Sequence, residues 1–181
     1  DNASSDGSKE VLEEYAKKDS RICLYRNEDN SATLLDSMRR YVDTEYFMIL
    51  DHDDYLEKDA LELLYKLAVK ENLDIVFGRC EMVGSKGEIL ETAGVRNDIA
   101  CMTKDGLCKF FAPLYWQMRT VWGKLIKKDM VQHIDEETYL YRQPSKYGGD
   151  TVIVLSMAFA AERLGTVGKV LHHYRILEKS Q

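Results

Sequence analysis

The sequence lacks the features of several protein classes. Its four cysteines form no Cys-x-x-Cys pair, which disfavours a zinc site and fits buried thiols in a reducing cytosol. The longest notable uncharged stretch, residues 151–161, has eleven residues, whereas a membrane-spanning helix needs about 20. Basic residues are too few to attract phosphate backbones, because 25 Lys and Arg stand against 31 Asp and Glu. We expect a soluble, cytoplasmic chain, at most peripheral to the inner face of the membrane, that binds no nucleic acid.

Linkers, repeats and low-complexity tracts are also absent from the 181 residues. With 45% hydrophobic residues, the chain can bury one sizeable core but not two. A single domain spanning residues 1–181 is therefore predicted. The sequence has neither a starting Met nor a signal sequence, so we expect that an upstream piece is missing.

Helical and strand patterns alternate along the chain. Ser8 can cap a first helix, and further helices are predicted from apolar spacing. The predicted helices cover 31–42, 58–70 and 151–163, and the predicted strands cover 22–25, 45–50, 73–82 and 170–174, with a hairpin turn at 84–87. This alternation favours the α/β class, with an open, mostly parallel mixed sheet and helices on both faces.

The most chemically suggestive segment is the acidic end of an apolar run at residues 47–54. A buried strand that ends in carboxylates presents hard oxygen ligands, which repel each other unless a cation lies between them. Asp51 and Asp53 are predicted to be metal ligands, and Asp54, near the following helix, to be structural. The alternative is that these acids only stabilise a helix N-terminus, by about 0.3 to 1 kcal/mol. Three acids in four residues exceed what that needs.

Five segments together resemble the family-two glycosyltransferases with a GT-A fold. The acidic turns are similar to that family's Asp-Asp-Gly-Ser-x-Asp-Gly-Ser and Asp-x-Asp-Asp motifs, and the later segments to its Trp-Asn-Lys-Leu, Glu-Asp-x and Tyr-Arg motifs. In chain order the matching segments are 1–8, 49–56, 121–125, 149–151 and 172–175.

The resemblance implies a reaction and a set of roles. Asp1 and Asp51 would contact a nucleotide-diphosphate sugar, most simply a UDP-sugar, and Asp51 and Asp53 would hold Mn²⁺ or Mg²⁺ against its diphosphate. Asp150 would be the base that activates an acceptor hydroxyl on a glycan or a lipid-linked glycan, with inversion at the sugar. Residues 1–100 would bind nucleotide and metal, and residues 101–181 the acceptor. Family precedent suggests bacterial surface polysaccharide synthesis.

The sequence departs from the family pattern in three places. The family's first strand and helix have no counterpart here, so we expect either an exposed strand edge or one covered by a second copy of the chain in a homodimer. At 34–36 the arginine of the family's Ala-Arg-Asn motif is absent, and Gly149 and Leu177 replace a Glu and a His.

Alternatives remain open for the function. A phosphohydrolase of the haloacid-dehalogenase type also has a strand followed by Asp-x-Asp, although Tyr55 occupies a position where Thr or Val is usual. A non-catalytic remnant that binds nucleotide-sugar is the third hypothesis. Asp150 is nearly as well explained as a helix N-cap.

Several other residues have two readings. If residues 170–174 form a strand, His172 and His173 lie on opposite faces, so at most one faces a cleft. The aromatic residues Tyr115, Trp116 and Trp122 could stack on a sugar ring, but such residues more often pack in a core. Cys23 and Cys80 are predicted to lie in the core.

Overall fold

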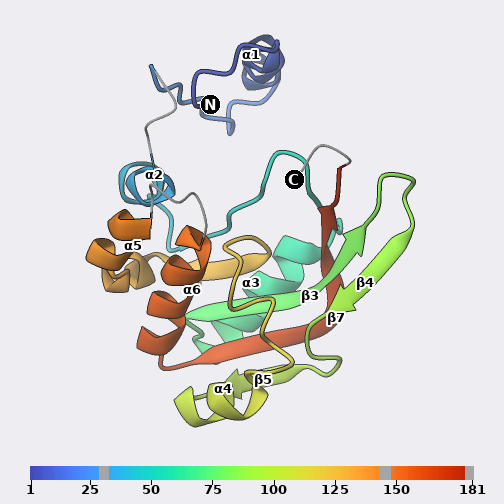
Figure 1. Ribbon diagram of the computed structural model, residues 1–181, viewed down its shortest axis with the longest axis vertical. Coiled ribbons are helices and arrows are strands. Elements are labelled where there is room, and N and C mark those ends of the chain that lie inside the picture. Colours follow the sequence, from blue (N-terminus) through green and yellow to red (C-terminus); the bar gives the residue numbers. More distant parts are fainter. Residues whose placement is uncertain (29–32, 143–147, 178–181) are drawn as a thin grey trace. The chain divides into compact units, whose positions relative to one another are not determined.

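The computed structural model describes residues 1–28, 33–142 and 148–177 (Figure 1). The chain divides into two compact units, Asp1–Val42 and Asp43–Gln181. Within the described ranges, no helix has the length and apolar character needed to cross a membrane.

The first unit contains two helices, α1 (Ser8–Lys18) and α2 (Leu34–Tyr41). Gly7, with a φ of 89°, is the N-cap of α1, so the prediction that Ser8 caps this helix is wrong. Glycine suits this position because a left-handed φ has no steric penalty without a Cβ atom. Thr33 caps α2 through a reciprocal capping box with Asp36. Both predicted helices are confirmed, although the expected start of the second at Ser31 lies outside the described residues.

The strand predicted at residues 22–25 does not form. The main chain there makes isolated bonds: the Ile22 nitrogen donates to the Asp19 carbonyl at 3.0 Å, and the Asp1 nitrogen donates to the Tyr25 carbonyl at 2.8 Å. A strand needs a ladder of such bonds along its length. The Cys23 side chain is exposed, so its predicted place in the core is wrong, whereas Cys80 is buried as predicted.

The second unit is built on a seven-stranded mixed sheet. Its central path runs in the order β1 (Tyr46–Phe47), β6 (Lys124–Lys127), β3 (Ile75–Val83), β7 (Leu164–Arg175) and β2 (Tyr55–Leu56), while β4 (Ile89–Ala93) pairs with β3 and β5 (Ile99–Met102) with β7. The predicted mixed α/β sheet is confirmed.

The proportion of parallel pairing is lower than predicted. Among the named strands only β3 and β7 pair in parallel, and the other pairs are antiparallel. The tight turn at residues 84–87 forces β3 and β4 into an antiparallel hairpin. Strand β5 begins at Ile99 and β6 lies beyond residue 100, where the alternation of helix and strand patterns loosens.

Four helices and one 3₁₀ helix accompany this sheet in the described part of the second unit. They are α3 (Ala60–Glu71), α4 (Lys104–Phe110), η1 (Lys128–His133), α5 (Glu136–Arg142) and α6 (Gly149–Ala160). Helix α3 packs against β3 and β7 (Figure 1), where Leu64 meets Val76 and Leu171 in a buried cluster. Ile75 and Phe77, which precede and follow Val76 in the sequence, are also buried. Because successive strand side chains point to opposite faces, both faces of β3 are covered.

Candidate active site

The acidic segment forms a tight turn between two sheet contacts. Before the turn, Ile49 makes a parallel bridge to Trp122. After it, β2 pairs with β7. The turn is closed by a hydrogen bond from the Asp54 nitrogen to the Asp51 carbonyl at 3.1 Å. Asp51 is exposed, Asp53 is half-buried and Asp54 is buried. The turn therefore offers two accessible carboxylates and encloses the third.

Asp54 attaches the turn to the end of β7. Its Oδ1 accepts a hydrogen bond from the Arg175 main-chain nitrogen at 3.0 Å, and its Oδ2 lies 3.2 Å from Nε2 of His172. The Arg175 side chain also donates from Nε to the Asp53 carbonyl oxygen. These contacts hold the turn at Asp53 and Asp54. The carboxylates of Asp51 and Asp53 are thereby presented from a fixed backbone.

His172 lies in a stack of aromatic rings behind this turn. Its ring is 4.4 Å from that of Trp122, with an angle of 10° between the planes, and Tyr174 lies 5.3 Å from Trp122. On the other side of β7, His173 stacks on Tyr55 at 4.4 Å. The two histidines therefore have separate surroundings. Trp122 is only 7% exposed, so its ring belongs to the packing and is not available to a sugar.

Asp150 lies in the first turn of α6. The N-cap of that helix is Gly148, with a φ of 82° and no side-chain cap, so the interpretation of Asp150 as an N-cap is wrong. Burial raises the pKa of Asp150, while the positive charge of Lys124 and a hydrogen bond from the Val121 main chain act in the opposite direction. The Asp150 carboxyl is thus partly desolvated and held by β6 and the residues before it.

Of the carboxylates predicted from the sequence, Asp51, Asp53 and Asp150 share one electrostatic site. Although Asp51 is exposed on one side, desolvation by the protein around its carboxyl raises its pKa, and the negative charges of Asp54, Asp150 and Asp53 raise it further, while His172 lowers it. Mutual repulsion of this kind arises where acids are close enough to interact. Residues about 100 positions apart in sequence are thereby brought together. Within the described ranges, however, no group of three or more His, Cys, Asp or Glu side chains has the arrangement of a metal site.

Lys124 is a site residue to which the sequence analysis gave no role. Its side chain is 1% exposed, and Nζ donates to the carbonyl oxygens of Thr120 at 2.6 Å and Trp122 at 3.1 Å. Burial lowers its pKa to about 7, an effect partly offset by Cys80 and Asp150. Gly123, with a φ of 70°, allows the tight bend between Trp122 and Lys124. The Trp-Gly-Lys segment that contains Lys124 resembles a family motif, and that resemblance alone does not indicate that the lysine is buried.

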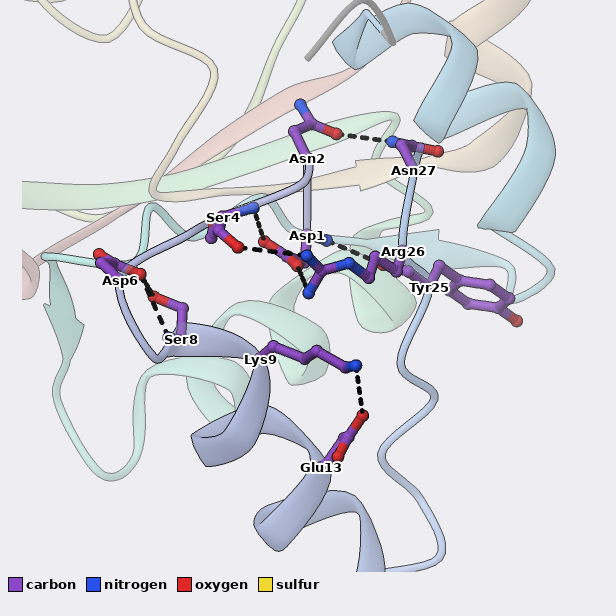
Figure 2. Close-up of polar contacts among 10 residues, drawn as sticks. All are labelled: Asp1, Asn2, Ser4, Asp6, Ser8, Lys9, Glu13, Tyr25, Arg26 and Asn27. Atoms are coloured by element: carbon purple, nitrogen blue, oxygen red, sulfur yellow. Dashed lines mark hydrogen bonds and ion pairs between the residues drawn. The ribbon is translucent and has the colours of Figure 1, made fainter. Parts of the chain in front are cut away.

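Asp1 lies in the first unit, where its carboxylate is held by Arg26 (Figure 2). Asp1 Oδ2 lies 2.9 Å from Nη1 of Arg26, and Oδ1 accepts from the Ser4 nitrogen at 3.1 Å. The neighbouring Asn2 accepts from Asn27 at 2.6 Å. These bonds fix residues 1–4 against residues 25–27. Arg26 was not singled out by the sequence, because one arginine in a polar stretch carries no pattern.

Comparison with known proteins identifies the family. Residues 1–134 match the model of glycosyl transferase family 2. The chain belongs to this family. It is similar to the glycosyltransferase GlyA of Streptococcus pneumoniae serotype 4 (strain ATCC BAA-334 / TIGR4), with 24% identity over 186 residues that cover 98% of this chain and 26% of that protein.

Solved structures of S. aureus TarS have the same fold. TarS 1-349 in complex with UDP-GlcNAc matches with a TM-score of 0.74 at 14% identity, covering 99% of this chain and 49% of that one. The crystal structure of TarS matches with a TM-score of 0.73 at 16% identity, covering 97% of this chain and 30% of that one. The predicted GT-A fold is confirmed. The chain spans about a quarter of the length of GlyA and half or less of these TarS chains.

Proposed function

We propose that this chain carries the active site of an inverting glycosyltransferase, which moves a sugar from a nucleotide-diphosphate donor to an acceptor hydroxyl. The observation that carries the proposal is that the charges of Asp53 and Asp150 both act on Asp51, so the three carboxylates belong to one site. Asp54, beside them, is enclosed against His172. Membership of glycosyl transferase family 2 supports the reaction class. The family match gives no comparable support to a phosphohydrolase.

The donor is proposed to be a UDP-sugar. TarS, which shares the fold, has been crystallised with UDP-GlcNAc and with UDP. Residues 1–100 would bind the nucleotide and the metal, with Asp1 and Asp51 toward the donor, and residues 101–181 would bind the acceptor. Because GlyA and TarS are both bacterial proteins, a glycan or lipid-linked glycan of bacterial surface polysaccharide is the proposed acceptor class.

Asp51 and Asp53 would hold Mn²⁺ or Mg²⁺. The fit rests on the donor set, because both carboxylates are accessible and the negative charge of Asp53 raises the pKa of Asp51, a repulsion that a hard divalent cation relieves. Two protein ligands leave room for phosphate oxygens of the donor in the coordination shell. When bound, the metal supplies positive charge to the leaving diphosphate.

Asp150 performs the proton transfer in this proposal. Its carboxylate accepts the proton of the acceptor hydroxyl as that oxygen forms a bond to the anomeric carbon from the face opposite the diphosphate. The bond to the diphosphate breaks, so the configuration inverts and the proton remains on Asp150. Lys124 and the Val121 main chain favour the ionised carboxylate that this step requires.

The test is Asp150→Asn, with Asp105→Asn in the first turn of α4 as the matched control. Asn keeps the size of the side chain and removes the base, so transfer should fall about 100-fold or more while donor affinity persists. The control should transfer at the wild-type rate. Transfer by Asp150→Asn within a few fold of wild type would exclude the base role. Donor binding without any turnover by the wild type would instead support a non-catalytic remnant.

A further inference from the structure

An exposed aromatic pair lies in the turns between α4 and β6. Tyr115 is 47% exposed and Trp116 is 37% exposed. The guanidinium of Arg119 lies over both rings, 5.1 Å from the centre of Tyr115 and 5.6 Å from that of Trp116. Arg119 Nη1 also lies 3.3 Å from the Tyr115 hydroxyl and donates to it. We call these three residues the Tyr115–Trp116–Arg119 platform.

The platform is joined to the helix that carries the proposed base. The Thr151 hydroxyl donates to the Arg119 carbonyl at 3.3 Å, and the main chain of Val121 bonds to the Asp150 carboxylate. The Thr120 hydroxyl donates to the Trp116 carbonyl at 3.2 Å, which fixes the turn between platform and base. The backbone of the platform therefore lies beside the first turn of α6.

The chemistry of the platform matches a carbohydrate. A pyranose ring has a face of C–H bonds that packs on an aromatic ring and an edge of hydroxyls that needs hydrogen-bond donors. Tyr and Trp supply the apolar surface, and a guanidinium supplies up to five N–H donors in a fixed plane. Binding sites commonly combine such aromatic surfaces with a few placed polar groups. Trp122, by contrast, is enclosed by its own stack and offers no free face.

We propose that the Tyr115–Trp116–Arg119 platform binds the acceptor, which is a glycan, by packing against a sugar ring and directing a hydroxyl of it toward Asp150. This inference rests on the proposed function, because it assigns the acceptor side of the same reaction. Whether the glycan is free or lipid-linked does not change the contact, since both present the same sugar ring.

The first experiment measures glycan binding without catalysis. Fluorescently labelled protein is applied with UDP to an array of immobilised oligosaccharides, and wild type is compared with Trp116→Ala and Arg119→Met. Phe159→Ala removes another exposed aromatic ring, 52% exposed on α6, and is the matched control. Wild type and the control should bind the same glycans, and both platform variants should lose most of that signal. Thermal unfolding identifies any variant that fails to fold.

The second experiment uses the glycans found on the array as acceptors. Trp116→Ala should raise the acceptor KM by about 2- to 10-fold, the range expected for losing one aromatic contact. The donor KM and the rate at which the donor is hydrolysed to UDP without an acceptor should stay within about twofold of wild type, because the aromatic contact is made only to the acceptor. An unchanged acceptor KM, an equal rise in donor KM, or no glycan bound by the wild type would overturn the inference.

The two proposals fail in different ways. Donor turnover that depends on Asp150 but glycan binding that does not depend on Trp116 would reject the platform alone. Glycan binding that depends on Trp116 without donor turnover would retain the platform and reject the transferase activity.

Discussion

The buried ammonium of Lys124 makes the stability of the protein depend on pH in a direction that can be worked out. Its pKa is lowered from an ordinary value of 10.5 to about 7, chiefly by burial. In the unfolded chain the pKa returns to its ordinary value, so between these two pH values the unfolded state binds more protons. Stability therefore rises with pH across this window. Below pH 7 both states are protonated and the full cost of burying the charge is present.

The magnitude follows from linkage. A difference of one bound proton changes the free energy of unfolding by about 1.4 kcal/mol per pH unit. Because the folded state is half protonated at pH 7, raising the pH from 7 to 9 should add about 2 kcal/mol to the stability of the wild type through Lys124 alone. Lys124→Met removes this titration and keeps a side chain of similar length, although it leaves the carbonyls of Thr120 and Trp122 without their donor. Its stability should lack that pH-dependent gain.

The assay is urea unfolding of both proteins at pH 6, 7, 8 and 9. The difference in free energy of unfolding between wild type and Lys124→Met should change little from pH 6 to 7 and then rise by about 2 kcal/mol toward pH 9. Groups common to both proteins cancel in this difference. The series ends at pH 9 because burial raises the pKa of Cys80 to about 12 while the charge of Lys124 lowers it, so the titration of this thiol at higher pH would differ between the two proteins and would not cancel. A difference that stays constant with pH would refute the lowered pKa of Lys124.

Three further predictions concern the metal and the core. In calorimetry Mn²⁺ should bind more tightly when UDP is present, because phosphate oxygens complete the coordination shell of the metal. Asp53→Ala should weaken that binding. If the substitution leaves Mn²⁺ affinity unchanged, Asp53 is not a metal ligand. Tyr46→Phe deletes the 2.9 Å hydrogen bond from the Tyr46 hydroxyl to the buried Leu73 carbonyl. Chemical unfolding should report a free energy of unfolding lower by about 0.5 to 1.5 kcal/mol. An unchanged value would mean that the hydroxyl contributes nothing to stability. In Gly78→Ala the added Cβ would lie 2.7 Å from the Leu171 side chain, so the free energy of unfolding should fall by about 1 to 3 kcal/mol. Unchanged stability would mean that the Leu171 side chain moves aside without cost.

The elements that the sequence predicted well have long, regular patterns. The strand at 73–82 and the helix at 58–70 match β3 and α3 closely, because one contains the β-forming apolar run at 75–77 and the other has apolar residues at helical spacing. The strand at 22–25 was equally apolar but finds no ladder of partners. Pairing is a property of the neighbouring segment, which a local pattern does not contain.

The site was only partly predictable, because some of its residues stand out in the local sequence and others do not. Asp51 and Asp53 stand out because acids cluster after an apolar run, and Asp150 was found only through the resemblance to the family. Lys124 was missed because a lysine in a short strand is normally read as solvent-facing. Its burial depends on Trp122 and Thr120, whose carbonyls turn inward to accept from it. That arrangement results from the bend at Gly123 and from tertiary packing, and no residue spacing encodes it.

One short segment connects the two halves of the proposed site. Trp122 bridges to Ile49, which precedes the acidic turn, and its ring packs on His172, the partner of Asp54. The adjacent Val121 bonds to the Asp150 carboxylate. Both the acidic turn and the proposed base are therefore positioned against the same two residues. A buried, stacked ring has few alternative rotamers in a close-packed interior, so the separation of the proposed metal ligands from Asp150 is set by packing before any substrate binds. Such pre-organisation is what a reaction between two bound substrates requires, since positioning supplies much of its rate.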